Sequence, residues 1–443
     1  MTRLSTTIAT LAGTVGLWLG GSLAILGPAE AVEIQEVTSP GGIKALLVED
    51  YSNPLIAMKF AFKGGGSTQD AAGKEGTANL MSGLLDEGAG DISSQAFQEK
   101  LDELGVSLSY DATYDSFSGS FRTITEFEDG AFDLLKLSVT ESRFDEEPVE
   151  RIRGQIAAGI IANERDPGEL ASKAWRETIF PGHPYARPKD GTVDTLKAVT
   201  KADLQDFRRR TFGRDNLIVG VVGAIDPATL GKRLDEVFGS LPAKAELTPV
   251  ADIAPVTGKR VDVDLGVPQT QIQFALPGVK RDAPDFFAAF LMNQIFGGGS
   301  FTSRLYTEVR EKRGLAYGAS SWLATFDHTA VLGAATATRS DKASESVKII
   351  EGEINRMASE GPTPEELAKA KEYVKGSYVI NNLDSSLSIA STLVGIQLDN
   401  LGIDYIDKRK GLIDAVTMDE VKAVAKKLLS VQPTIITVGP AGA

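Results

Sequence analysis

The chain repeats a group of short segments, and this internal repetition constrains its fold more strongly than any single motif. The tripeptide Ala-Val-Thr occurs at residues 198–200 and again at residues 415–417. In each copy a pair of predicted strands precedes it, and an amphipathic helical pattern and an apolar run ending in Val-Gly follow it. These companion segments are 44–63, 201–210 and 217–223 in the first copy, and 260–277, 418–429 and 435–439 in the second. Self-similarity at so long a period predicts two domains of similar fold.

Two domains are therefore expected, although the 443 residues alone would suggest about one domain per 150 residues. Residues 242–258 lie between the two copies and carry several prolines and alanines, a composition typical of a linker. We expect an N-terminal domain over 32–241 and a C-terminal domain over 259–443.

The fold class follows from strand pairs that alternate with helices. Apolar and polar residues alternate with a period of two in each predicted strand. The predicted strands are 106–110, 116–124, 315–325 and 330–338, and the predicted helices include 95–104, 127–142, 148–163, 341–359 and 363–381. Thr363 and Glu366 have the spacing of a capping box, which marks the start of the last helix. This order predicts the α+β class, with helices packed on sheets, and not a doubly wound parallel sheet.

Composition excludes several kinds of site. The chain has no cysteine and only two histidines, His183 and His328. The lack of cysteine excludes disulfide scaffolds, thiolate metal sites and cysteine nucleophiles. The net charge is −14, from 46 basic and 60 acidic residues, which disfavours nucleic acid and an anionic membrane surface as partners.

The N-terminus has the features of a targeting segment. Arg3 precedes an apolar stretch over 8–27, and Ala29-Glu30-Ala31 offers a small-x-small cleavage pattern. We predict a signal peptide over 1–31, with export to the periplasm and no membrane attachment after cleavage. The alternative is an uncleaved anchor, because about 20 apolar residues can also span a bilayer.

A helix is predicted over 76–85, and it carries small and polar residues on one face. Residues 62–67 read Phe-Lys-Gly-Gly-Gly-Ser, and residues 76–83 read Gly-Thr-Ala-Asn-Leu-Met-Ser-Gly. The apolar residues follow a helical period, which leaves Asn79, Ser82 and Gly83 together on the opposite face. A glycine inside a helix costs about 1 kcal/mol relative to alanine, which is unusual in a purely structural element. The alternative is an ordinary core helix with small exposed residues.

These segments resemble the region around the inverted zinc motif of the pitrilysin/insulinase-type metallopeptidases. In that family, H-x-x-E-H on such a helix supplies two zinc-binding histidines and a glutamate that acts as general base. The matching positions here hold Asn79, Ser82 and Gly83. The family's third ligand, a glutamate, falls at Gly159 by spacing, or at Glu150 if the intervening loops differ in length. Zinc requires imidazole, thiolate or carboxylate, so the resemblance implies a degenerate site with no metal in this chain.

A second segment of the same family is present around the first histidine. Residues 180–185 read Phe-Pro-Gly-His-Pro-Tyr, and Gly-Thr follows at 191–192. His183 is expected to be a loop residue with a structural hydrogen bond. His328 follows Phe-Asp in a predicted hairpin turn and is expected at the surface.

The C-terminal copy holds the strongest positive motif, over residues 296–317. We expect its glycine loop to contact substrate; this loop comprises Gly297, Gly298, Gly299 and Ser300. A helix is predicted to begin near residue 302 and to end at Gly314, and a strand is predicted to follow.

Arg310 lies in the last turn of that predicted helix, and Tyr317 lies on the strand, so the glycine turn is expected to bring their side chains together. In the family that this motif resembles, such an arginine and tyrosine bind the substrate carbonyl and stabilise the oxyanion at the zinc site. A guanidinium and a phenol are suitable donors for that role. The alternative is that Arg310 only complements the helix dipole and Tyr317 only packs on a sheet.

The resemblance covers nearly all of residues 32–443 and implies two similar domains arranged as a clamshell around a peptide-sized chamber. In some bacterial and mitochondrial members the zinc motif resides in one subunit and is lost from the other. We therefore expect a non-catalytic subunit of an exported heteromeric zinc metallopeptidase. The zinc would be held by a homologous partner subunit, and the substrate would be a peptide.

Two other functions stay open at this point. One is a peptide-binding or scaffold protein without a proteolytic role. The other is a self-sufficient peptidase with a different metal site, for which His183 would be the residue to test.

Overall fold

Two β-sheets, one from each half of the sequence, organise the computed structural model, which describes residues 33–441. The predicted signal peptide and the side chain of Ser300 lie outside this description. Among the helices of residues 33–441, none combines the length and apolarity needed to cross a membrane.

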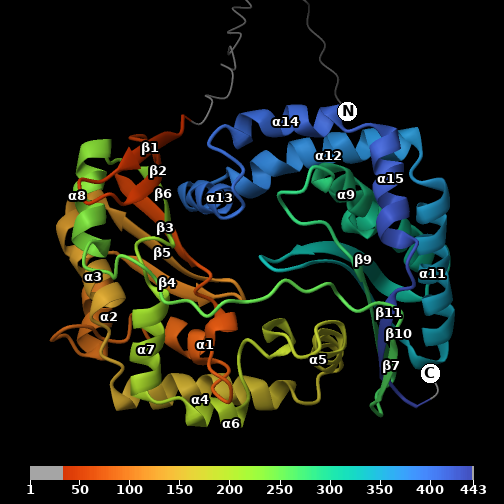
Figure 1. Cartoon of the computed structure of the whole chain (residues 1–443), viewed down its shortest axis with the longest axis horizontal. Helices are drawn as coiled ribbons and strands as arrows, with labels where there is room; N and C mark the ends of the chain where they lie inside the picture. The colour runs from red at the N-terminus through yellow and green to blue at the C-terminus, as the bar shows by residue number, and fades with distance from the viewer. Residues whose placement is uncertain (1–32, 442–443) are drawn as a thin grey trace, which may run out of the picture. The chain divides into compact units, whose positions relative to one another are not determined.

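Eleven strands of the described residues form the two sheets (Figure 1). The first sheet contains β1 (Gln35–Thr38), β2 (Lys44–Glu49), β3 (Leu55–Lys63), β4 (Ser107–Ala112), β5 (Ser116–Ile124) and β6 (Leu217–Gly223). The second contains β7 (Arg260–Asp264), β8 (Gln269–Pro277), β9 (Ala316–Thr325), β10 (Ala330–Arg339) and β11 (Thr434–Gly439). Their orders are β1-β2-β6-β3-β5-β4 and β7-β11-β8-β10-β9.

The two sheets repeat one pairing scheme. In the first sheet β2 and β6 pair in parallel, while β6 with β3, β3 with β5, and β5 with β4 pair antiparallel. In the second, β7 and β11 pair in parallel, and the next three pairs are again antiparallel. Strand β1 is an addition at the edge of the first sheet. The predicted α+β class and the two similar sheet-plus-helix halves are confirmed.

The helices follow the same repeated order. The N-terminal half contains α1 (Thr77–Ser82), α2 (Ser94–Glu103), α3 (Glu128–Thr140), α4 (Glu146–Asn163), α5 (Pro167–Ile179), α6 (Val193–Ala198), α7 (Lys201–Thr211) and α8 (Pro227–Phe238). The C-terminal half contains α9 (Phe286–Asn293), α10 (Arg304–Tyr306), α11 (Ala343–Glu360), α12 (Pro364–Asn382), α13 (Ser386–Leu398), α14 (Tyr405–Ala415) and α15 (Met418–Leu429). The run α4 to α7 before β6 thus matches the run α12 to α15 before β11.

The repeated Ala-Val-Thr has a physical explanation. Thr200 and Thr417 are the N-caps of α7 and α15, and each forms a capping box with the acidic residue three positions later. The valines before them, Val199 and Val416, are buried. The capping box predicted at Thr363 is also confirmed at the start of α12.

Each half has its own core on one face of its sheet. In the first half, Val219 and Val221 of β6 belong to a cluster that also contains apolar residues of α1, α3 and α8. In the second half, Ile272 and Phe274 of β8 pack with residues of α9, α11 and α15.

The opposite face of each sheet is covered by a helix from the other half. Helix α13 lies against β3 and β6, and Gln397 donates a hydrogen bond of 2.9 Å to the carbonyl of Val219 (Figure 1). Helix α5 lies against β8 and β11, and the indole of Trp175 donates to the carbonyl of Phe274 over 3.2 Å. The two halves therefore exchange equivalent helices, which the sequence does not predict.

The segment between α8 and β7 is extended and hydrogen-bonded along its length. Thr248 exchanges two hydrogen bonds with the side chain of Gln69, at 2.7 and 3.1 Å. Further on, Ile253 donates to the carbonyl of His328, and Val256 donates to that of Ile179. The segment thus contacts both halves along its path.

Two predicted elements differ from the structure. The helix expected over 76–85 ends at Ser82, and turns follow it. The helix expected after the glycine loop is present from Arg304 to Glu311, but it is α-helical only over α10 and π-helical over Thr307–Glu311.

Candidate functional site

Helix α1 presents its half-buried face through Asn79 and Ser82. Ser82 does not point to a ligand, because its hydroxyl donates a 2.8 Å hydrogen bond to the carbonyl of Asn79. Ala78, Leu80 and Met81 are fully buried in the first core. The helix is therefore placed as expected, with its two polar side chains turned away from the core.

Gly83 follows the helix and contacts α4 closely. Its φ of −83° is available to any residue, so backbone conformation does not require glycine there. A Cβ added at Gly83 would lie 2.9 Å from Cγ2 of Ile152. The glycine is needed because α4 packs directly on this turn, which explains the residue that seemed out of place in a helix.

The positions predicted for a third ligand do not lie at this contact. Gly159 is exposed, and an added Cβ there would meet nothing within 4 Å. Glu150 is also exposed and accepts a 3.2 Å hydrogen bond from Arg153. The residue of α4 that faces Gly83 is Ile152, which has no donor atom for a metal.

These residues do not fit a zinc ion. An amide, a hydroxyl, a glycine and an isoleucine replace the imidazole and carboxylate ligands that zinc requires. Across residues 33–441, no three histidine or acidic side chains gather into a group that could hold a metal ion.

Asp70 positions α1, although sequence analysis did not single it out. Its carboxylate accepts hydrogen bonds from the backbone of Gly76 at 2.8 Å and of Ala78 at 3.0 Å. Burial raises the pKa of Asp70 to about 7, although these two bonds act to lower it. Arg187 donates to the carbonyls of Asp70 and Thr68 and so holds the same loop. Asp70 lies outside the cap position itself, so the usual spacing rules do not find it.

The glycine loop is a close-packed turn at the end of α9. A Cβ at Gly297 would lie 2.5 Å from the hydroxyl of Ser321 on β9, and one at Gly299 would lie 2.6 Å from the carbonyl of Gln294. A Cβ at Gly298 would meet the side chain of Asn293 at 2.8 Å. Packing against β9 and against the loop's own helix therefore accounts for all three glycines. Ser300 begins a short turn, and nothing is described of its side chain.

Arg310 and Tyr317 are both exposed, but they are not joined to each other. Within residues 33–441, the guanidinium of Arg310 donates instead to the hydroxyl of Tyr306, one helical turn earlier, and lies over its ring at 4.9 Å. Tyr317 lies on β9, the outermost strand of the second sheet, and is 87% exposed. The expectation that the glycine turn brings the two side chains together is not met in this conformation.

Both histidines lie where the two halves meet the connecting segment. His183 is 8% exposed, and its Nε2 is 2.8 Å from the carbonyl of Ala251, as expected for a structural residue. His328 is less exposed than expected, and its Nδ1 is 3.2 Å from Asp252. Between them, the hydroxyl of Tyr185 donates to Asp115 over 2.6 Å.

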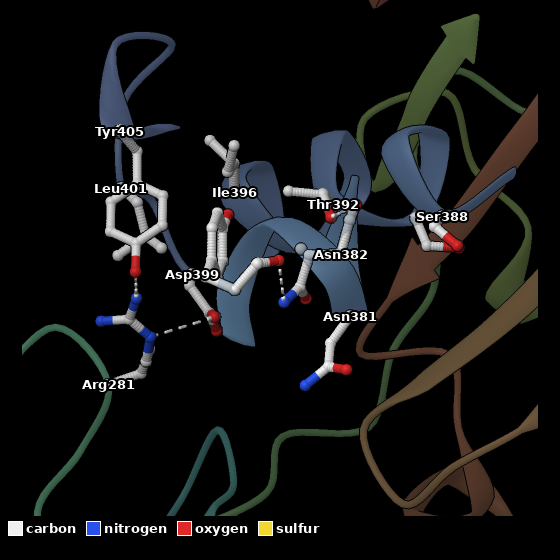
Figure 2. Close-up of a pocket in the computed structure, with 12 residues that line it drawn as sticks. Arg281, Asn381, Asn382, Ser388, Thr392, Ile396, Asp399, Leu401 and Tyr405 are labelled. Carbon is white, nitrogen blue, oxygen red and sulfur yellow. Dashed lines mark hydrogen bonds and ion pairs between the residues drawn. The ribbon is translucent and has the colours of Figure 1, made fainter. Parts of the chain in front are cut away.

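The sequence did not predict a cavity of about 360 Å³ between α12, α13 and the start of α14, which we name the C-half cavity (Figure 2). Arg281 forms one wall. It donates a 2.5 Å hydrogen bond to the hydroxyl of Tyr405 and lies 3.8 Å from the carboxylate of Asp399. Asn382 and Thr392 line another side of the cavity.

Comparison with known proteins places these features in a family. The family model described as insulinase (peptidase family M16) matches residues 59–192, and the model described as peptidase M16 inactive domain matches residues 198–374. A protein of Streptomyces coelicolor described as an uncharacterized zinc protease is 27% identical, over 92% of this chain and 90% of its own length. The non-peptidase homolog YmxG of Helicobacter pylori is 25% identical, over 82% of this chain and 84% of its own length.

Solved structures agree with that assignment. The crystal structure of a peptidase M16 inactive domain from Pseudomonas fluorescens is 28% identical and has a TM-score of 0.87, and the match covers 93% of this chain and 98% of that one. A protease from Helicobacter pylori, at 20% identity and a TM-score of 0.82, shares the fold. Two family models that match successive parts of the sequence, together with this structural likeness, show that the chain belongs to the insulinase (M16) family of peptidases.

Proposed function

We propose that this chain is the zinc-less subunit of an exported, heteromeric zinc metallopeptidase. In this proposal a homologous partner subunit holds the zinc and the general base. This chain contributes substrate binding and oxyanion stabilisation across the interface, through Arg310 and Tyr317. The predicted signal peptide over residues 1–31 supports export.

The observation that carries the proposal is that one chain combines a zinc-site helix without zinc ligands and an exposed pair of hydrogen-bond donors. The helix that would bind zinc is present and packed in place, but it offers Asn79, Ser82 and Gly83. The polar pair of the other half, Arg310 and Tyr317, is exposed.

The chemistry of the pair suits an oxyanion. A guanidinium and a phenol can both donate hydrogen bonds to a developing negative charge, and one such donor is worth about 10²- to 10³-fold in kcat. Tyr317 lies on the outermost strand β9, where a peptide could add as a further strand. Arg310 would have to leave the hydroxyl of Tyr306 to reach that peptide.

Similarity to other proteins supports a non-catalytic role. The model matched over residues 198–374 and the structure from Pseudomonas fluorescens are both described as a peptidase M16 inactive domain, and the relative from Helicobacter pylori is described as a non-peptidase homolog.

The test is to purify the mature chain alone, a homologue carrying H-x-x-E-H alone, and the two together, and to measure cleavage of an internally quenched peptide. We expect activity only from the mixture. Tyr317→Phe should lower kcat of the mixture by about 10²-fold or more, because the oxyanion loses a donor. Full activity of the zinc-bearing chain alone would refute the proposal.

Two other tyrosines, Tyr373 and Tyr306, serve as controls. Tyr373→Phe changes a residue that is 57% exposed on α12 and should leave kcat unchanged. Tyr306→Phe removes the hydroxyl that holds Arg310, so it should preserve or raise kcat. A loss with Tyr306→Phe equal to that with Tyr317→Phe would show that the effect comes from disturbing the region and not from the oxyanion.

The alternative is a peptide-binding or scaffold protein without a proteolytic role. One observation favours it: Arg310 is already engaged by Tyr306 within the chain. This alternative expects peptide affinity from the chain alone and no gain in turnover when a zinc-bearing homologue is added.

A further inference from the structure

The N-terminal half contains a cavity in the place equivalent to the C-half cavity. This N-half cavity, of about 570 Å³, lies between the end of α4, helix α5 and the loop over residues 188–194. The C-half cavity lies between the end of α12, helix α13 and the start of α14. Each cavity therefore lies beside the helix that is exchanged between halves.

The two cavities differ in where their arginine comes from. Helices α5 and α13 are both 13 residues long, and their tenth residues are Arg176 and Gly395. In the C-half cavity the guanidinium belongs to Arg281, outside the helix, and it is satisfied by Tyr405 and Asp399 (Figure 2). The N-half cavity has its arginine on the helix itself.

Arg176 has no partner for its charge. Its Nε is buried and makes no hydrogen bond, and across residues 33–441 no ion pair or hydrogen bond engages its side chain. A buried donor left without an acceptor costs about 1–3 kcal/mol, more when the group is charged, so it is rarely left so without a reason. Burial raises the pKa of Tyr114, and the nearby Arg176 counteracts that rise, which places the guanidinium beside this wall of the cavity.

The rest of the lining includes both charged and apolar side chains. Among the described residues, Glu164, Glu169 and Asp194 form no ion pair. Ile160, Leu170 and Val193 supply apolar surface in the same cavity. Among the described residues the lining thus offers two unpaired cations, Arg176 and Lys173, together with carboxylates and apolar surface, which suit a ligand with a negative charge at one end and a positive charge at the other.

We propose that the N-half cavity binds the C-terminal end of a short peptide, with its α-carboxylate on Arg176. A guanidinium binds a carboxylate through two parallel hydrogen bonds, and the two terminal nitrogens of Arg176, which carry no hydrogen bond among the described residues, can donate both. The volume is within the range of small-ligand sites and far larger than a lone carboxylate needs. The free carboxylates can receive the ammonium group at the other end of the peptide. The site needs no partner subunit, so it is independent of the function proposed above.

The test is isothermal titration calorimetry of the mature chain with tetra-alanine as the free acid and as the C-terminal amide, at neutral pH and low salt. We expect the free acid to bind at least tenfold more tightly than the amide. Arg176→Gln should remove that difference. Arg176→Lys should keep part of it, because a lysine retains the positive charge but cannot form the two parallel hydrogen bonds of a guanidinium. Arg281→Gln, in the C-half cavity, is the matched control and should leave both affinities unchanged.

Several results would overturn the proposal. Equal binding of acid and amide by the unaltered chain would do so without any substitution, as would absence of binding by the free acid. An unchanged preference in a folded Arg176→Gln variant, verified by its circular dichroism, would exclude Arg176 as the carboxylate site. Sodium acetate that competes at the same concentration as tetra-alanine would show that the site takes any carboxylate and not a peptide end.

Discussion

Ile152 on α4 lies so close to Gly83 that a Cβ added at position 83 would be 2.9 Å from Cγ2 of Ile152. This contact occupies the side of α1 where a metal ligand would have to project. A zinc-binding side chain at position 83 would therefore also require Ile152 to move. Restoring H-x-x-E-H at residues 79–83 would place a histidine against Ile152.

Gly83→Ala is expected to destabilise the protein by about 1–3 kcal/mol, the usual cost of overpacking. The conformational entropy of the unfolded chain alone predicts the opposite, since replacing glycine by alanine at an allowed φ stabilises a protein by about 0.4–1 kcal/mol. Unfolding in denaturant shows whether the substitution lowers or raises the free energy of unfolding. The double variant Gly83→Ala with Ile152→Ala should cost less than the sum of the two single changes, because the clash is then absent. A stabilised Gly83→Ala variant would contradict the contact.

The repeated order of strands and helices was predictable from the sequence, because it depends on patterns of neighbouring residues. Capping threonines, alternating strands and Val-Gly strand ends recur in both copies. The exchange of α5 and α13 was not predictable, since an amphipathic helix has the same period whichever sheet it covers. Trp175 and Gln397 gave no sign that their partners lie in the other half.

The residues of the candidate site could be identified from the sequence, but the contacts that they form could not. Spacing along the chain led to Gly159, whereas the packing of α4 places Ile152 at Gly83. Arg310 bonds to Tyr306 because residues four apart on a helical turn are neighbours, a signal that was present in the sequence. Arg176 gave no signal, because its lack of a partner is a property of the folded chain.

The hydrogen bond from Trp175 to Phe274 should contribute to the joining of the halves. Trp175→Phe removes a buried donor and leaves a small void, so the free energy of unfolding should fall by about 1–3 kcal/mol. Gln397→Leu removes the equivalent bond in the other exchanged helix and should cost about 1 kcal/mol. Unfolding by urea should stay a single transition in both variants. A loss below about 0.5 kcal/mol for Trp175→Phe would show that the bond contributes little.

Tyr185→Phe should destabilise the protein more at neutral pH than in acid. Burial raises the pKa of Asp115, and the hydrogen bond from Tyr185 works against that rise. Without the hydroxyl, an ionised Asp115 loses a donor, at a cost of about 1–3 kcal/mol. The cost should shrink as the pH falls below 3.8, the ordinary pKa of an aspartate, because Asp115 then becomes protonated in both the folded and the unfolded chain. Tyr114→Phe, which removes only a 3.1 Å bond to the carbonyl of Arg187, should show a smaller loss without this pH dependence.

Glu366 should stabilise the C-terminal half above about pH 4.5 and cease to do so in strong acid. It accepts two 2.7 Å hydrogen bonds from the half-buried Arg304 and completes the capping box of α12. Although burial acts to raise it, these hydrogen bonds lower the pKa of Glu366 to about 2, from 4.5. Because the pKa is lower in the folded chain, this stabilisation is complete above pH 4.5 and is lost as the pH falls towards 2.

The variant Glu366→Gln isolates that contribution. At pH 7 it should lower the free energy of unfolding by about 1.5–3 kcal/mol, the usual value for hydrogen bonds to a charged group. The difference from the unaltered protein should narrow steadily between pH 4.5 and pH 2. Glu365→Gln is the matched control, because its carboxylate is exposed and its one ion-pair partner among residues 33–441 is Lys369 on the same helix. A difference for Glu366→Gln that stayed constant down to pH 2 would mean that packing of the side chain, and not its charge, stabilises the junction between Arg304 and α12.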